Sequence, residues 1–547
     1  MTPQGTPHFS DVSPMLRTCV GPDGRFRVGR HQPDFSVVNL RKNDFIARLG
    51  QQSDGTPVWN HVNFPETDVR EPAADMIYEI PNPLPFRGTT YINSAWADPK
   101  AGQPEKIRIA APSPCSLFDG LETFQPGMAQ DDKIGLLTAL PHPLKLALAQ
   151  VSSDPQELCA LARLAGTLLF EPGRDIPWGM GFTSDRQGKP VPDIRFPDLF
   201  DILVNNPHLP DAYKTAMVLR PGIQGTSEIV GEYTGDHTHV FEYLRRNSYI
   251  PWGHFAANMA HDRIRYRASD LTVEDIRGLR HLYYQRIYCR VAKQLQIPLP
   301  RHRTGLSAKD LETLRQAIIT ALENGGGSEL QFNGALWGWN FGFGSAASGH
   351  RLHASHQMIH QQNALVPRQM NDEHGDSLPC FACGDLVSDF IRIFETTHDR
   401  PFFDAYIDAM TNNRRTDGDA KKEASLIIHE DDHVMLFVPK AQVSEWELQV
   451  MTRSRVPHVL AADTAVRDSL DTAILKTVKT LENLGASLVT GIELSARFDE
   501  SPSNQHLIYS FIPRLPYAPP TFSEAQLRWI TGVYPEDLAR ACRDMLT

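Results

Sequence analysis

The densest group of potentially reactive side chains in this chain is Asn340-Phe-Gly-Phe-Gly-Ser-Ala-Ala-Ser-Gly-His350-Arg-Leu-His353-Ala-Ser355-His356-Gln-Met358-Ile-His360-Gln-Gln362. In it a glycine- and serine-rich loop leads into four histidines. Glycines let backbone N–H groups turn toward an anion, and hydroxyl groups add further donors. The pattern therefore predicts a phosphate-binding loop with histidines beside it. The candidate phosphate-binding residues are Asn340, Gly342, Gly344, Ser345 and Arg351.

Two secondary structures fit the histidine stretch. In a strand, side chains alternate between two faces, so His356, His360 and Gln362 would share one face. In a helix, residues three and four apart are neighbours, so His353, His356 and His360 would fall on one side and suit a metal. The metalloprotease form of such a helix needs a glutamate after the first histidine, and position 357 is Gln. We favour the strand and keep the helix as an alternative.

Length and charge exclude several classes of protein. A chain of 547 residues is longer than a single hydrophobic core usually stabilises, so we expect about two to four domains. The net charge of −11 argues against a general nucleic-acid-binding protein, which would carry a basic excess. No apolar run reaches the roughly 20 residues of a membrane helix, and the N-terminus lacks the features of a signal peptide. We expect a soluble, cytoplasmic protein with no nucleic-acid or membrane partner.

The cysteines predict no disulfide framework, because seven of them, an odd number, are spread over a long chain. Cys380 and Cys383 form a Cys-x-x-Cys pair. The residues alone leave three interpretations of this pair open: a redox pair, two buried thiols or part of a zinc site. We expect the other five cysteines to be ordinary core or surface thiols.

The first 225 residues contain no recognisable chemical motif. Residues up to about 110 are rich in Pro, Asn, Asp and Gly, with short extended runs at Met76–Ile80 and Thr89–Asn93. Helical segments such as Pro155–Ala165 follow among proline-rich connections. This region is predicted to be an extension of mixed structure, and its role stays open.

After residue 225, an order of strands, a helix and a histidine-bearing strand occurs twice, at about 226–367 and 380–515. The predicted strands before the two helices are 240–244, 252–259, 425–428, 433–439 and 446–451, and 506–513 is the last strand of the second unit. Thr272 is the expected N-cap of the first helix, and a further helix should run from Ser307 to Gly325. The second unit's helix should end at Gly485. The polar segment 368–379 is expected to be a linker. The order of elements predicts two α+β modules.

The histidine stretch resembles the histidine-triad superfamily, in the branch that contains galactose-1-phosphate uridylyltransferase and diadenosine tetraphosphate phosphorylase. That branch carries Ser-x-x-His-x-His-x-Gln on a strand, with the second histidine as the nucleophile. Ser355, His360 and Gln362 match the pattern, whereas Met358 replaces the first histidine. The resemblance covers roughly residues 226–547.

The second module departs from the family pattern in the opposite way. His506 keeps the place of the first histidine, Ile508 stands at the place of the nucleophile, and Ser510 stands at that of the glutamine. In this branch the first histidine often joins a Cys-x-x-Cys pair and an upstream histidine around a structural zinc. The resemblance therefore implies zinc as a cofactor, held by Cys380, Cys383, His458 and His506. His429 and His433 compete with His458 for the third position.

The resemblance implies an α+β fold of two histidine-triad-like modules, each an antiparallel sheet with helices, arranged as a pseudo-dimer in one chain. The expected division is an N-terminal region 1–225, a catalytic module 226–367, a linker 368–379 and a second module 380–547 with the zinc site. Whether the two modules suffice as a monomer or pair again as a homodimer stays open.

The resemblance also implies nucleotidyl transfer by a ping-pong mechanism. His360 would attack an α-phosphate to give a nucleotidyl-histidine, and Gln362 and Ser355 would support the phosphate oxygens. The substrate would be a nucleoside diphosphate sugar or a dinucleoside polyphosphate, and phosphate or a sugar phosphate would be the acceptor. Two alternatives stay open. One is a catalytically silent nucleotide-binding or scaffold protein, and the other is a metal-dependent hydrolase using His353, His356 and His360.

Overall fold

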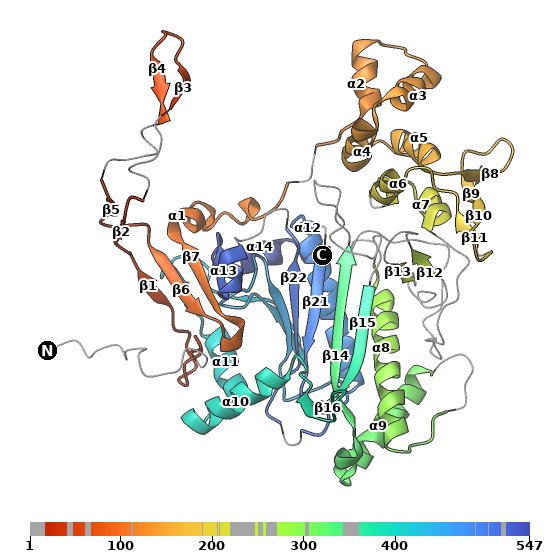
Figure 1. The fold of residues 1–547 in the computed structure, drawn as a ribbon. Helices are drawn as coiled ribbons and strands as arrows, with labels where there is room; N and C mark the ends of the chain where they lie inside the picture. Colours follow the sequence, from red (N-terminus) through yellow and green to blue (C-terminus); the bar gives the residue numbers. More distant parts are fainter. Residues whose placement is uncertain are drawn as a thin grey trace.

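A seven-stranded antiparallel sheet organises the chain (Figure 1). The computed structural model describes residues 17–40, 47–60, 67–110, 113–188, 190–204, 206, 208–218, 247–249, 255–258, 271–300, 306–342, 360–486, 488–500, 503–515 and 521–546. In spatial order the strands of the sheet are β15 (His360–Pro367), β14 (Phe332–Gly342), β21 (Leu488–Leu494), β22 (Ile508–Pro513), β20 (Leu448–Thr452), β19 (Val434–Phe437) and β18 (Ile427–Glu430). The sheet thus joins strands from both predicted modules.

Two long helices cover one face of this sheet. α8 (Val273–Gln294) packs against β14 and β15, α12 (Thr464–Asn483) packs against β19 to β22, and the two helices contact each other. α9 (Ala308–Glu323) packs on the outer side of α8 (Figure 1). Alternate strand residues such as Trp337, Trp339 and Tyr509 are buried in the core between sheet and helices. Because side chains alternate along a strand, the residues between them point to the opposite face.

The opposite face of β19, β20 and β22 carries a second hydrophobic core. Met435, Phe437, Met451 and Ile508 pack there against α10 (Asp385–His398), α11 (Phe402–Thr411) and a smaller sheet. In spatial order that sheet contains β1 (Gly29–His31), β6 (Ile77–Pro81), β7 (Thr89–Asn93) and β23 (Arg528–Thr531). Strand β23 pairs with β7 in parallel, so the N-terminal region and the C-terminal segment share one sheet.

The remaining elements form a helical lobe, several hairpins and the C-terminal helices. The lobe, drawn above the large sheet in Figure 1, contains α2 (Leu117–Phe124), α3 (Gln130–Ala139), α4 (His142–Val151), α5 (Pro155–Ala165), α6 (Pro197–Val204) and α7 (Asp211–Val218). Its short strands are β8 (Leu168–Phe170), β9 (Pro177–Met180), β10 (Phe182–Ser184) and β11 (Pro190–Pro192). The hairpins near the N-terminus are β2 (Phe35–Val37) with β5 (Val69–Glu71) and β3 (Arg48–Gln51) with β4 (Pro57–Trp59). Two short helices, α1 (Ser94–Ala97) and α13 (Thr521–Ala525), and the terminal α14 (Pro535–Asp544) lie outside the lobe and these hairpins.

Local capping chemistry confirms the predicted helix ends. Thr272 caps α8, and its side chain and that of Asp275 bond reciprocally to each other's backbone N–H groups, a capping box worth about 1 kcal/mol. Ser307 caps α9 through the backbone N–H of Asp310. Gly325, which follows the end of α9, has a φ of 94°, a backbone conformation that favours glycine. The helix predicted at residues 155–165 is α5, with the same bounds.

The predicted α+β class is confirmed, and strands lie before and after each of the two long helices. Strands β12 (Asn247–Tyr249) and β13 (Phe255–Asn258) precede α8, which β14 and β15 follow after α9, while β19 and β20 precede α12 and β21 and β22 follow it. The strand predicted at 240–244 lies outside the described residues. The sheet does not confirm a pseudo-dimer of two separate modules, since β14 pairs directly with β21 in one continuous sheet.

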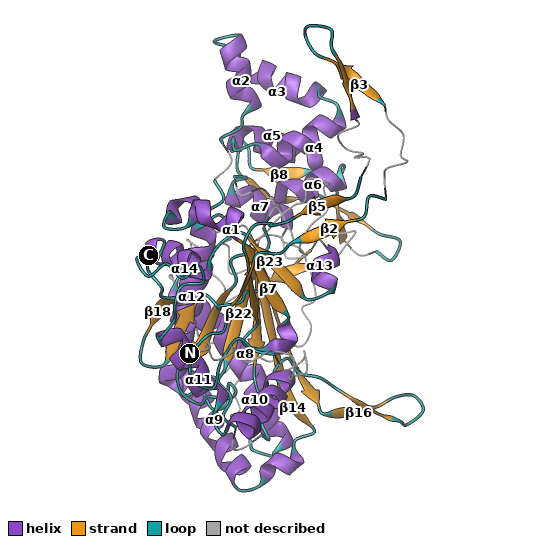
Figure 2. Cartoon of the chain, turned by 90° about the vertical axis from the view of Figure 1, so that its left-hand side faces the viewer, coloured by secondary structure: helices purple, strands orange, loops and turns teal. Residues whose placement is uncertain are grey.

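The linker predicted at residues 368–379 is instead a β-hairpin. Strands β16 (Gln369–Asn371) and β17 (Ser377–Pro379) pair in antiparallel fashion, and the hairpin projects from the body of the protein (Figure 2). The Asp372 side chain accepts backbone N–H bonds from His374 and Asp376, and Gly375 has a φ of 88°. The polar residues that suggested a linker are therefore turn formers. No helix in the described part of the chain is long and apolar enough to cross a membrane.

Candidate functional site

The sheet register gathers the predicted catalytic strand and two polar residues on one face. Position 360 pairs with Asn340 and Gln362 pairs with Gly338, while Asn340 also pairs with Thr490 of β21. Register partners in an antiparallel sheet lie on the same face, with their Cβ atoms about 4.5–5.5 Å apart. This face, opposite the one that carries Trp337 and Trp339, is called the β15 face below. The strand interpretation is confirmed for residues from His360 onward.

A hydrogen bond fixes the orientation of Asn340 on the β15 face. The hydroxyl of Thr490 donates to Asn340 Oδ1 over 2.7 Å, and both residues are partly buried. With its oxygen engaged in this way, the amide nitrogen of Asn340 presents two N–H groups. Gln362, on the neighbouring strand, is exposed. The arrangement offers amide donors of the kind that phosphate oxygens need.

The back of the same strands is held rigidly against α8. Trp337 Nε1 donates to Gln361 Oε1 over 2.8 Å, and Gln361 Nε2 donates to the backbone oxygen of Leu279 over 3.1 Å. Trp337, Gln361 and Trp339 are all buried. Because a one-residue slip would expose all of these side chains, the buried face fixes which residues of β15 lie on the open face.

Asn340 and Gly342 lie in strand β14, although the sequence suggested a glycine-rich loop. The alternation of Ala335, Trp337 and Trp339 into the core stabilises the strand through this region. Among the residues predicted to bind phosphate or to act in catalysis, Ser355, Gly344, Ser345 and Arg351 lie outside the described residues, as do His350, His353 and His356. For His360 the backbone is described and the side chain is not. The metal-binding helix alternative does not hold at position 360, because this residue begins β15.

The matching positions in β22, within the stretch predicted as a second module, are buried. Ile508, at the nucleophile's place, is 1% exposed within the second hydrophobic core. Ser510, at the glutamine's place, donates to Glu447 Oε1 over 2.7 Å, and Arg87 Nη1 forms an ion pair with the same carboxylate at 2.7 Å. Ile508 has no acid–base or nucleophilic group, and the hydroxyl of Ser510 is already bonded to a buried carboxylate.

The residues predicted to hold zinc do not fit a zinc site. All four are described, and no group of three His, Cys, Asp or Glu side chains within the described ranges could hold a metal. His458 Nδ1 accepts the backbone N–H of Ala461 over 3.2 Å, so in the neutral ring the proton lies on Nε2. Burial lowers the pKa of His458 to about 4, which keeps the ring neutral. His506 Nδ1 donates to the backbone oxygen of Thr452 over 2.6 Å.

The Cys-x-x-Cys segment is organised by an ion pair. Arg497 forms a salt bridge with Asp385 at 2.7 Å and donates to the backbone oxygen of Cys380 over 2.5 Å. Asp385 in turn accepts the backbone N–H of Ala382 over 2.8 Å. Cys383 is exposed. Charged side chains thus give this segment its shape.

His429, one of the two competitors for the third zinc position, has a ring partner on α12. His429 lies 3.1 Å from Lys476 Nζ, and burial together with that cation lowers the pKa of His429. The backbone N–H of His433 donates to Asp431.

Thr490 is a site residue that the sequence analysis missed, because strand β21 itself was not predicted. Thr490 reaches the site because β21 pairs with β14. The sequence alone does not show which strands pair, so it gave no signal for this residue.

Comparisons with known proteins find similarity in structure alone. No protein-family model matches the chain, and no curated protein matches it. An ADP-glucose phosphorylase from Arabidopsis thaliana, solved with bound ADP-glucose, is similar over 51% of this chain and 70% of its own, at 13% identity and a TM-score of 0.34. A GalT-like protein from Arabidopsis thaliana covers 43% of this chain and 69% of its own, at 12% identity and a TM-score of 0.30. A uridylyltransferase structure covers 55% of this chain and 80% of its own, at 12% identity and a TM-score of 0.32.

These values are too low for the likeness to assign an activity, a substrate or a residue role to this chain. Two of the structures are titled a GalT-like protein and a uridylyltransferase, and a uridylyltransferase is also a member of the branch that the histidine stretch resembles.

Proposed function

We propose that this protein transfers a nucleotidyl group from a nucleoside diphosphate sugar or a dinucleoside polyphosphate through a covalent intermediate on His360. The observation that carries the proposal is the sheet register, which puts positions 360 and 362 on one face with Asn340 and Thr490. This is the alternation that the histidine-to-glutamine pattern requires.

The chemistry follows from the residues of the β15 face. The imidazole of His360 would attack the α-phosphorus, an N–P bond would form, and the P–O bond to the leaving phosphate would break. Charge develops on the non-bridging oxygens during this step, and the amides of Gln362 and Asn340 on the same face are candidate donors to them. The acceptor, phosphate or a sugar phosphate, would then attack the same phosphorus and release His360.

The stretch predicted as a second module lacks a nucleophile at the position that matches His360, which is consistent with a single catalytic histidine. With Ile508 buried in the core and Ser510 bonded to Glu447, the two modules cannot act as equivalent sites. Catalysis would therefore depend on one histidine, and a single substitution would abolish it. That expectation separates this protein from one with two working sites.

The test is to detect the intermediate directly. Purified protein is incubated with single nucleotide sugars or dinucleoside polyphosphates. The reaction is quenched in base because N–P bonds are acid-labile, and the mass of the intact protein is measured by mass spectrometry. We expect a mass increase equal to one nucleoside monophosphate for the true donor and none for His360→Ala. His374→Ala is the matched control, because His374 is a highly exposed histidine on the β16–β17 hairpin.

Each other outcome has a defined meaning. An adduct that persists in His360→Ala contradicts the nucleophile assignment. Nucleotide binding by calorimetry without an adduct or turnover favours the silent nucleotide-binding interpretation. Turnover that requires an added metal and forms no adduct contradicts the covalent route through His360.

A further inference from the structure

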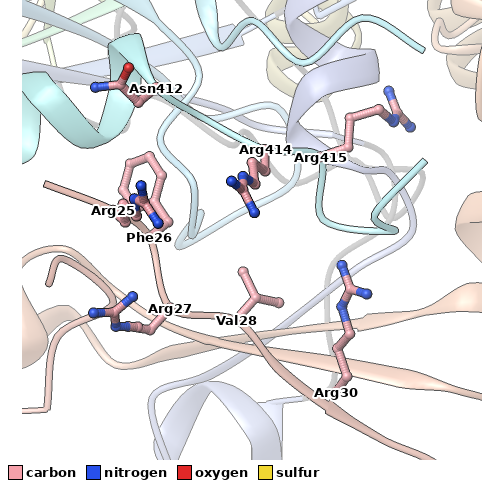
Figure 3. Close-up of a pocket in the computed structure, with 8 residues that line it drawn as sticks. All are labelled: Arg25, Phe26, Arg27, Val28, Arg30, Asn412, Arg414 and Arg415. Atoms are coloured by element: carbon pink, nitrogen blue, oxygen red, sulfur yellow. The ribbon is translucent and has the colours of Figure 1, made fainter. Parts of the chain in front are cut away.

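A concave basic site lies away from the β15 face, at the C-terminal end of α11. Its cavity of about 300 Å³ is lined by Arg25, Phe26, Arg27, Val28, Arg30, Asn412, Arg414 and Arg415 (Figure 3). The site is formed by an N-terminal segment, residues 25–30, and by the turn that follows α11. In Figure 1, β1 and α11 lie on the side of the large sheet away from β15, so this arginine pocket is separate from the proposed catalytic face.

One of the five arginines has a structural role. Arg415 forms a salt bridge with Asp537 at 2.8 Å and with Asp417 at 2.9 Å, and its side chain is 2% exposed. These carboxylates raise the pKa of Arg415, although burial alone would lower it. In Figure 3 its side chain turns away from the cavity. Arg415 therefore anchors the turn and is not a free cation.

Two further arginines are held in place at the rim. Arg27 forms an exposed salt bridge with Asp23 at 2.9 Å. Arg30 donates to the backbone oxygen of Thr416 over 2.8 Å, and its guanidinium lies 5.7 Å from the ring centre of Tyr78. A carbonyl and an aromatic face position Arg30 without neutralising its charge.

Arg25 and Arg414 have no carboxylate partner among the described residues, and both are exposed. In Figure 3 the guanidinium of Arg414 projects from the turn toward the segment that carries Phe26 and Val28. Arg25, Arg30 and Arg414 thus bring three unneutralised guanidinium groups to one cavity from two segments far apart in the chain. Like charges gathered in a concave site repel each other and focus a positive potential.

We propose that the arginine pocket binds a small molecule with two or more linked phosphate groups. Guanidinium groups bond phosphate oxygens in pairs, which makes arginine the preferred side chain for such ligands. A cavity of about 300 Å³ is at the lower end of the range for small-molecule sites. Phe26 and Val28 add apolar surface between the arginines, which an organic group on the phosphates can contact.

Binding there would join two parts of the chain. The ligand would bridge residues 25–30, which lead into β1, to the turn after α11, and it would relieve the repulsion between Arg25, Arg30 and Arg414. A ligand that binds the folded state raises its apparent stability by mass action. The pocket would therefore make the attachment of the N-terminal sheet to the second module responsive to phosphorylated metabolites. This inference does not depend on the reaction proposed for His360.

The test is calorimetric titration of the full chain with inorganic pyrophosphate, ADP and sulfate at matched ionic strength. Pyrophosphate and ADP should bind, sulfate should bind much more weakly, and affinity should fall as salt rises. Arg414→Gln and Arg25→Gln should each weaken binding about tenfold, as expected for loss of one charge-assisted contact. Arg392→Gln is the matched control, since Arg392 is an exposed arginine on α10.

Two further variants make the outcome decisive. His360→Ala should bind pyrophosphate unchanged, because the β15 face is a different site. Binding that is lost in His360→Ala and retained in the Arg25→Gln, Arg414→Gln double variant would place the ligand on the β15 face and overturn the proposal. Equal affinity for sulfate and pyrophosphate would also overturn it, since only general charge attraction would remain. Melting temperatures without ligand verify that each variant is folded.

Discussion

The guanidinium of Arg280 in α8 lies 4.8 Å from the ring centre of Tyr509 in β22. Arg280 is fully buried, and the rings of Tyr283, Tyr284 and Trp337 also surround its guanidinium. Two carboxylates share its single charge: Asp471 of α12 at 3.6 Å and Glu493 of β21 at 3.8 Å. This cluster ties α8 to α12 and to strands β21 and β22 of the large sheet.

Replacement of Arg280 by Met should destabilise the protein strongly. The variant keeps much of the side-chain volume and leaves Glu493 and Asp471 buried without a cation, which typically costs about 3–5 kcal/mol. Urea unfolding followed by tryptophan fluorescence measures the change. Arg392→Met on exposed α10 is the control and should shift the free energy of unfolding by less than about 0.5 kcal/mol. Equal shifts for the two variants would contradict a structural role for Arg280.

Asp471 should make stability depend on pH. Burial raises the pKa of Asp471 to about 7 from an ordinary value of 3.8, and the nearby Arg280 only partly opposes that shift. The folded state therefore holds this proton more firmly than the unfolded state does. The stabilisation is fully present below about pH 4 and is lost as the pH rises through 7.

The neutral Asp471→Asn variant isolates this effect. Between pH 5 and pH 8, wild type should lose on the order of 2–3 kcal/mol of unfolding free energy relative to the variant. The measurement is urea unfolding of both proteins at the two pH values. Parallel pH profiles would show that Asp471 does not titrate in this range.

Gln362→Ala should slow formation of the nucleotide adduct while leaving the fold intact. Gln362 is exposed on the β15 face, and loss of one donor to a developing oxyanion typically costs about 10²–10³ in rate. The rate of adduct formation from the donor found by mass spectrometry is the readout, with the affinity for that donor measured separately. Gln369→Ala, on the β16–β17 hairpin, is the control. A large loss of affinity with no change in rate would make Gln362 a binding residue only.

Removal of Cys383 should change neither metal content nor stability appreciably. Arg497 and Asp385 organise the Cys-x-x-Cys segment, and neither cysteine belongs to a group of three metal-ligating side chains in the described ranges. We therefore expect Cys383→Ser to match wild type in elemental analysis for zinc and to melt within a degree or two of it. By contrast, Arg497→Met should lower the melting temperature. Stoichiometric zinc that disappears in Cys383→Ser would restore the predicted zinc site.

The elements that the sequence predicted well are those with local chemistry at their ends. Thr272, Ser307 and Gly325 mark helix boundaries through their own hydrogen bonds or backbone conformation, so their neighbours in sequence suffice to find them. Strand β14 was missed because its glycines, Gly338 and Gly342, are poor strand formers. Burial of Trp337 and Trp339 overrides that local preference, and burial is a property of the assembled core.

The alternation of β15 from His360 to Gln362 and the absence of a histidine at position 508 can both be read from neighbouring residues in the sequence. The sequence could not determine what faces these positions. Asn340 and Thr490 are 150 residues apart and meet because β14 pairs with β21, and Arg25 and Arg414 line one cavity because the N-terminal segment packs beside α11. Local conformation follows from neighbouring residues. Contacts between residues far apart in the sequence follow from strand pairing and core packing across the whole chain, and therefore become visible in the folded structure alone.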